Sequence, residues 1–149
     1  MKYTVEVVIN APQEEVFAAI NEDEQIKQWN SLFVENRYES EEDRHTYKPG
    51  TKYTSVTKIG KKEYAFEGTL LEYDAPYKTT AQSNTKEGVN KITYICESLA
   101  ANRTRVVMHL EVEPSNFYYK IMIKLFGWLT KGLYMEQFES LKEYLESRD

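Results

Sequence analysis

The chain has 149 residues and a formal net charge of −5, from 19 Lys and Arg against 24 Asp and Glu. This balance argues against general nucleic-acid binding, because phosphate contacts need a concentrated basic surface. The single cysteine, Cys96, excludes an internal disulfide and fits a reducing compartment, so we expect a cytoplasmic protein. The first residues alternate and no apolar run reaches about 18 residues, so neither a signal peptide nor a transmembrane helix is expected.

The first third of the chain predicts a strand followed by two short helices. Apolar and polar residues alternate over 3–9, which is typical of a half-buried strand. Pro12 then suits the first position of a helix, and an apolar stripe continues to Ile20. A second short helix, about 22–28, leads to Trp29.

The middle of the chain predicts an antiparallel meander. From Leu32 to about Leu110 the pattern alternates between strand and turn, and the connections are short. The acidic stretch 39–45 within it is interpreted as a solvated loop. After it come five β-rich runs: 51–59, 62–73, 77–85, 89–98 and 103–112.

Residues 117–147 predict one long helix whose first half is unusually apolar. The stretch 116–134 is rich in aromatic and aliphatic residues and contains Lys120, Lys124 and Lys131 but no acid. Three interpretations stay open: a buried helix half with snorkelling lysines, the lining or gate of a cavity, or a face that contacts membranes or partners. No linker interrupts the chain, so residues 1–149 are predicted to form one domain.

The opening "VINAPQEEVFAAINEDEQIKQW" resembles the START-like (SRPBCC) superfamily, which includes polyketide cyclase/dehydrase-like and pollen-allergen-like proteins. "YKPGTKY", Gly60 and "LLEYDAPYK" are similar to later segments of that family. The resemblance implies an α+β helix-grip fold, in which a curved antiparallel sheet of about seven strands wraps around the C-terminal helix. It also implies an internal cavity for lipids, polyketides or other apolar molecules.

The residues give little support to catalysis or metal binding. Cys96 is predicted to be a small core residue, and His45 and His109 to face solvent. Neither histidine has a nucleophile at a recognisable spacing, and no ligand set for a metal is present, so no catalytic residue, metal or cofactor is expected. Glu35 and Arg37 should be either both internal or both at the surface, and the surface arrangement is favoured.

The sequence therefore predicts a protein that binds a small apolar or amphipathic ligand without catalysis, with transient membrane-surface contact through 117–134 as a further hypothesis. The alternatives are a cyclase or dehydratase acting on a polyketide-like substrate, and an interaction module like the chaperone-ATPase activators of the same superfamily. Strand parity and a four-residue helical repeat predict one pocket. Its residues are Trp29, Phe33, Tyr53, Phe66, Tyr94, Met108, Phe117, Ile121 and Leu125.

Overall fold

The computed structural model describes residues 1–148, and Asp149 of the predicted domain lies outside the described residues. The helices and strands follow in this order: β1 (Lys2–Ile9), α1 (Gln13–Asn21), α2 (Asp23–Trp29), β2 (Phe33–Tyr38), α3 (Glu41–Thr46), β3 (Lys52–Ile59), β4 (Lys62–Asp74), β5 (Lys78–Thr85), β6 (Gly88–Ala100), β7 (Arg103–Pro114) and α4 (Phe117–Glu146). The strands form one antiparallel seven-stranded sheet in the order β1-β7-β6-β5-β4-β3-β2. The predicted helix-grip architecture is confirmed.

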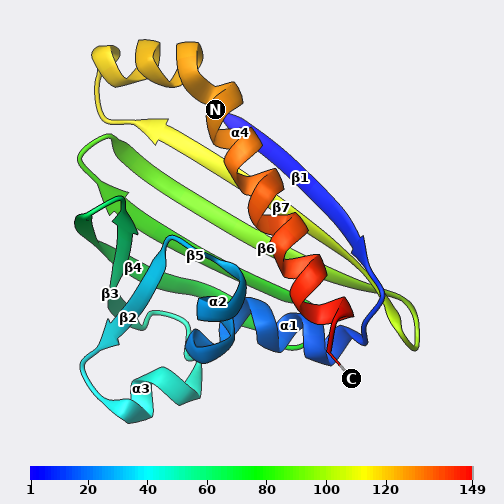
Figure 1. Cartoon of the computed structure of the whole chain (residues 1–149). Helices are drawn as coiled ribbons and strands as arrows, with labels where there is room; N and C mark the ends of the chain where they lie inside the picture. The colour runs from blue at the N-terminus through cyan, green and yellow to red at the C-terminus, as the bar shows by residue number, and fades with distance from the viewer. Residues whose placement is uncertain (149) are drawn as a thin grey trace.

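The sheet curves around α4, which runs diagonally across its concave face (Figure 1). The short helices α1 and α2 lie near the C-terminal end of α4 (Figure 1). The first turns of α4 lie at the opposite end, past the end of β7. Within residues 1–148, no helix combines the length and the apolar character needed to cross a bilayer.

A solid hydrophobic core occupies only one side of this interior. It lies where the C-terminal half of α4 and helix α1 cover β1, β7 and β6. Its fully buried side chains include Ile9, Val16, Met108 and Leu141, together with Cys96. The prediction that Cys96 is a buried core residue is therefore confirmed.

The interpretation of residues 39–45 as a loop is wrong, because most of this stretch forms helix α3. Ser40 is its N-cap, and its Oγ accepts a hydrogen bond from the backbone N–H of Asp43 at 3.1 Å. Glu41, Glu42 and Asp43 fill the first turn, where carboxylates interact favourably with the positive end of the helix dipole. The acidic cluster that suggested a solvated loop thus stabilises a helix start.

Candidate functional site

A cavity of about 340 Å³ lies beside the solid core, between strands β2 to β6, the short helices and the middle of α4. This volume falls within the roughly 300–1,000 Å³ of small-molecule sites. Strands β1 and β7 do not contribute to its lining, because α4 packs directly on them. The interior of the fold is therefore filled on one side and open on the other.

The apolar part of the lining is built on Trp29, at the end of α2. Its indole N–H donates to the backbone oxygen of Ala19 at 2.9 Å, which satisfies the polar group of this buried ring. The ring is then free to present its apolar surface to the cavity. Other apolar lining residues come from both helices and strands: Ile20, Ile26, Phe33, Phe66, Leu70, Ala81 and Ile92.

Tyr53 on β3 stays against the sheet because its neighbour on β4 is a glycine. Tyr53 is paired with Gly68, and a Cβ at Gly68 would lie 2.5 Å from the Tyr53 ring. Real side chains do not approach so closely, so any larger residue at Gly68 would displace the ring. The absence of a side chain at Gly68 therefore lets the Tyr53 ring pack directly over the backbone of β4.

The lining also carries uncharged polar groups, several of them phenols. Burial raises the pKa of Tyr53 to about 12 and raises the pKa of Tyr94 and Tyr134 above that of a free phenol. These tyrosines therefore remain neutral hydrogen-bonding groups at physiological pH. Thr79 on β5 is buried and lines the cavity, and its hydroxyl has no hydrogen-bond partner among residues 1–148.

A hydrogen bond between α4 and the segment that follows α2 closes one side of the cavity. The side-chain amide of Gln137 donates to Oδ1 of Asn30 at 3.3 Å, and the same oxygen accepts from the backbone N–H of Leu32 at 3.1 Å. Leu133, one turn before Gln137, lines the cavity and is also exposed to solvent. Leu133 therefore marks a mouth of the cavity on α4.

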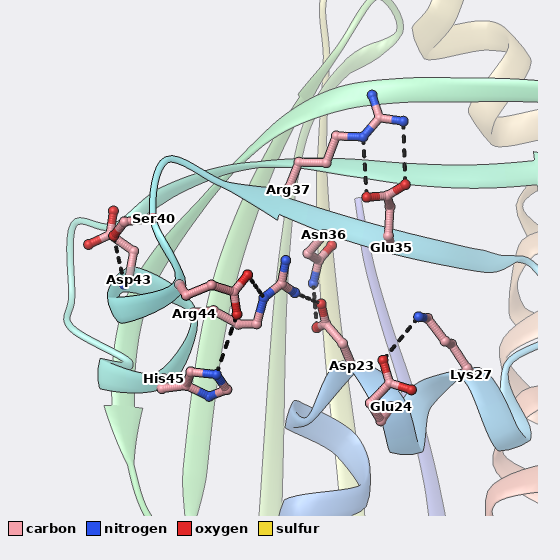
Figure 2. Close-up of polar contacts among 11 residues, drawn as sticks. Asp23, Glu24, Lys27, Glu35, Asn36, Arg37, Ser40, Asp43, Arg44 and His45 are labelled. Carbon is pink, nitrogen blue, oxygen red and sulfur yellow. Dashed lines mark hydrogen bonds and ion pairs between the residues drawn. The ribbon is translucent and has the colours of Figure 1, made fainter.

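Helix α3 covers the opposite end and is held by a partly buried ion pair (Figure 2). Arg44 of α3 bonds to Asp23 at the start of α2, and Asn36 of β2 donates to the same carboxylate at 3.4 Å. Desolvation raises the pKa of Asp23, although the neighbouring Arg44 acts in the opposite direction. The Arg44 guanidinium also lies 5.0 Å from the ring centre of Tyr38, a residue of the cavity wall.

Tyr47 follows α3 and shapes the same end of the cavity. It has a positive φ of 49°, which is uncommon for a residue other than glycine. Its ring stacks on Tyr73 with 4.5 Å between centroids, and Tyr73 contacts Phe17 edge-on at 5.4 Å. This aromatic stack connects the end of α3 to the solid core.

Five of the nine predicted pocket residues line the cavity: Trp29, Phe33, Tyr53, Phe66 and Tyr94. Whether they bind a ligand stays a prediction. Met108 does not line the cavity, because it lies on β7 between β1 and β6 and is fully enclosed by the solid core. The alternation of residues in this strand correctly predicted that Met108 faces the interior. Alternation does not reveal where the strand lies in the sheet, so it could not predict which part of the interior Met108 occupies.

Phe117, Ile121 and Leu125 also lie outside the cavity. Phe117 is 74% exposed, Leu125 is 59% exposed, and Ile121 is exposed as well. Their four-residue repeat does place them on one helix face, but that face points away from the sheet. The interpretation of this segment as a buried helix half is wrong for these residues. The nine predicted pocket residues did not include Thr79, Leu133 or Tyr134, although the stretch 116–134 was among the candidates for a cavity lining or gate.

The remaining chemical candidates lie away from the cavity. Arg37 and Glu35 form a surface ion pair at 3.3 Å, and His45 lies at the surface beside Glu41. His109 is exposed on the outer face of the sheet, where Nδ1 is 3.0 Å from the hydroxyl of Thr4. In the described part of the chain, no three His, Cys, Asp or Glu side chains are grouped so that they could hold a metal. Burial raises the pKa of the Cys96 thiol to about 12, which makes it a poor nucleophile at neutral pH.

Comparisons with known proteins agree with this architecture. The family described as "Polyketide cyclase / dehydrase and lipid transport" matches residues 1–146. No curated protein matches the sequence.

Solved structures match over nearly the whole chain. The protein TTHA0849 from Thermus thermophilus gives a TM-score of 0.73 at 17% identity, with 97% of each chain covered. A protein from Arthrobacter aurescens gives 0.76 at 16% identity, covering 99% of this chain and 87% of that one. The di-domain ARO/CYC BexL from the BE-7585A biosynthetic pathway gives 0.74 at 12% identity, covering 98% of this chain and 46% of that one. At these identities the likeness concerns the fold alone.

Proposed function

Because the chain belongs to the polyketide cyclase/dehydrase and lipid transport family, we propose that it binds one small, uncharged, amphipathic molecule in the cavity beside α4, without catalysis. The observation that carries this proposal is the lining itself. It combines apolar rings with neutral hydrogen-bonding groups in a space of about 340 Å³. Such a mixture is suited to a molecule with an apolar body and a few oxygen atoms.

The charge of the lining restricts the ligand further. Asp43 is the one charged side chain among the described residues that line the cavity, and no Lys, Arg or His joins it. A ligand carboxylate or phosphate would therefore lose its hydration without gaining a cationic partner, which is costly. A neutral ligand that accepts or donates a hydrogen bond at the unpartnered Thr79 hydroxyl avoids this cost.

Two measurements test the proposal. Native mass spectrometry of freshly purified protein should detect a copurifying apolar molecule, and a neutral fluorescent apolar probe should bind at one site. Ala81→Phe places a ring in the cavity and should abolish probe binding with little loss of stability, because open space receives the ring. Asn84→Phe, on the exposed side of the same strand, is the matched control and should bind the probe normally.

A different set of results would contradict the ligand-binding proposal. If wild-type protein binds neither a copurifying molecule nor the probe, and Ala81→Phe destabilises the fold, the space is ordinary imperfect packing. Met108→Trp is not a substitute for Ala81→Phe, because Met108 lies in the solid core and a larger ring there would overpack it.

A second candidate is cyclase or dehydratase action on a polyketide-like substrate, which the description of the family includes. The phenols of the lining favour it in one respect, because neutral tyrosines can donate hydrogen bonds to a carbonyl oxygen. Proton abstraction would fall to Asp43, the one carboxylate that residues 1–148 contribute to the lining. Recovery of a bound molecule unchanged after prolonged incubation supports binding, whereas its conversion, lost in Asp43→Asn, supports this second candidate.

A further inference from the structure

The first half of α4 carries a continuous apolar surface that nothing in the described structure covers. Its exposed side chains are Phe117, Tyr118, Ile121, Leu125, Phe126, Trp128, Leu129, Leu133 and Met135. The side chain of Trp128, for example, is 71% exposed. Single exposed apolar residues are ordinary on proteins, but nine within five turns of one helix form a contact surface. We call this group the α4 apolar face.

Along the α4 apolar face, within residues 117–135, all charged side chains are positive. Lys120, Lys124 and Lys131 are exposed and lie along one edge of it, and residues 117–135 contain no acid. Beyond Met135 the exposed side of the same helix becomes acidic and carries Glu136, Glu139 and Glu143. The apolar surface therefore ends where the acidic residues begin. Aromatic and aliphatic residues bordered by lysines are typical of helices that lie in the interface of a membrane.

We propose that the α4 apolar face docks onto an anionic lipid bilayer, with its aromatic and aliphatic side chains inserted among the headgroups. Charge complementarity favours this occupant. The protein as a whole carries −5, so its positive segment meets a negative surface while the acidic remainder stays in solution. A second copy placed symmetrically on the same face offers no acid within residues 117–135 to pair with the three lysines.

A second basic segment lies at the same end of the fold. In the antiparallel meander, the β3–β4 hairpin, the β5–β6 hairpin and the β7–α4 connection share one end of the sheet (Figure 1). Ser115 before α4 donates its hydroxyl to the backbone oxygen of Lys86 in the β5–β6 hairpin at 2.8 Å. The β3–β4 hairpin carries Lys58, Lys61 and Lys62, all exposed, around Ile59, which is 58% exposed.

The α4 apolar face is continuous with the cavity. Leu133 belongs to it and also lines the cavity next to Tyr134. Docking of the helix would therefore bring the mouth at Leu133 toward the hydrocarbon. An apolar molecule could then pass between bilayer and cavity without crossing open water.

Vesicle binding tests the proposal, with Trp128 as its reporter. On vesicles of phosphatidylcholine and phosphatidylserine, Trp128 emission should shift to shorter wavelength and the protein should cosediment. Trp29 is buried, so its emission should not change. Leu125→Glu should weaken vesicle binding at least tenfold, because a charge replaces an inserted apolar side chain. Leu99→Glu is the matched control, since Leu99 is exposed near the opposite end of the sheet and should bind normally.

The lysines give a second test. Lys120→Glu/Lys124→Glu should weaken binding roughly 30-fold or more, since each lysine near an anionic surface contributes about fivefold. Lys48→Glu/Lys91→Glu changes the net charge equally at exposed sites elsewhere and should have a much smaller effect. Added salt should weaken the wild type, and vesicles of phosphatidylcholine alone should bind weakly.

Three results would overturn the proposal. One is no binding of wild-type protein to anionic vesicles. Another is equal loss of binding in Leu125→Glu and Leu99→Glu. The third is a stable dimer in solution that Leu125→Glu dissociates, which would assign the α4 apolar face to a second copy. Binding is measured on vesicles without a cavity ligand, so failure here and failure of the ligand-binding proposal are distinguishable.

Discussion

At the scale of single residues, the two glycines of α4 have different roles. Sequence alone predicts that each weakens the helix by about 1 kcal/mol relative to alanine. In the structure, a Cβ at Gly127 would lie 2.2 Å from the hydroxyl oxygen of Tyr3, whereas a Cβ at Gly132 meets nothing within 4 Å. Gly127 therefore allows β1 and α4 to approach closely, and Gly132 has no such packing role.

Alanine substitutions should separate the two glycines. Gly127→Ala should lower the free energy of unfolding by roughly 1–3 kcal/mol, because the methyl group overlaps Tyr3. Gly132→Ala should raise it by about 1 kcal/mol, because helix propensity improves in open space. Urea denaturation of both variants measures the difference. Equal effects of the two substitutions would contradict the close packing of Tyr3 on Gly127.

Tyr3→Phe provides an internal control for this interpretation. The Tyr3 hydroxyl is buried and has no hydrogen-bond partner in the described part of the chain, so its removal should not destabilise the fold. In the Tyr3→Phe background, Gly127→Ala should cost less than in the wild type, because the nearest atom is gone.

At the scale of elements, α3 is held in place by the pair between Arg44 and Asp23. The Asp23 side chain is 10% exposed, so removal of Arg44 leaves a carboxylate with little access to water. The pair between Arg37 and Glu35 has the same chemistry on the surface, where both side chains are well hydrated. Two arginines seven residues apart thus allow a matched comparison.

Arg44→Met should destabilise the protein by about 1–3 kcal/mol, whereas Arg37→Met should change stability by less than about 1 kcal/mol. Thermal or urea unfolding at pH 7 and low salt measures both. The loss in Arg44→Met should shrink in an Asp23→Asn background, because the unpaired charge is then absent. A loss for Arg37→Met as large as for Arg44→Met would show that α3 does not depend on this pair.

The sequence was informative about elements and less so about their arrangement. Alternation and turn residues predicted six of the seven strands and the long helix closely. The acidic segment around Asp43 was misinterpreted because carboxylates suit both a solvated loop and the first turn of a helix. In the structure, the backbone N–H of Asp43 donates to the Ser40 hydroxyl, which identifies Ser40 as the N-cap of a helix.

For the candidate site, the sequence likewise predicted which side chains face inward better than where they lie in the fold. The alternation of strand residues correctly predicted that Tyr94 and Met108 face the interior. Tyr94 lines the cavity, whereas Met108, its partner on β7, lies in the solid core. The two environments therefore meet at neighbouring strands, β6 and β7. The difference arises from where α4 rests on the sheet, which depends on contacts between distant segments such as Tyr3 and Gly127.

At the scale of the whole molecule, the cavity is surrounded by phenols that are partly removed from water. Desolvation is the main cause that raises the pKa of Tyr38, Tyr47 and Tyr53 from 10.0 to about 12. These residues lie on β2, directly after α3 and on β3, so they report on the part of the cavity wall that these elements form. Unfolding exposes these phenols to water and lowers their pKa toward that of a free phenol, so their ionisation favours the unfolded state.

This coupling predicts alkaline sensitivity with a defined sign. Between about pH 10 and pH 12 the folded protein retains the phenolic protons, whereas the unfolded chain releases them. The unfolded state then binds fewer protons, so the free energy of unfolding falls as pH rises through this window. Each tyrosine contributes a slope of up to about 1.4 kcal/mol per pH unit. Cys96 adds to the same loss from about pH 9, because burial raises its pKa from 9.0 to about 12.

Urea unfolding followed by tryptophan fluorescence at pH 7, 9, 10 and 11 measures this slope. Stability should be nearly constant up to about pH 9 and should then decline steeply. Tyr53→Phe should reduce the decline, because the phenylalanine ring has no proton to lose on unfolding, whereas Tyr118→Phe at an exposed ring on α4 should leave it unchanged. A stability profile that stays flat between pH 9.5 and 11 would contradict the burial of the phenols around the cavity.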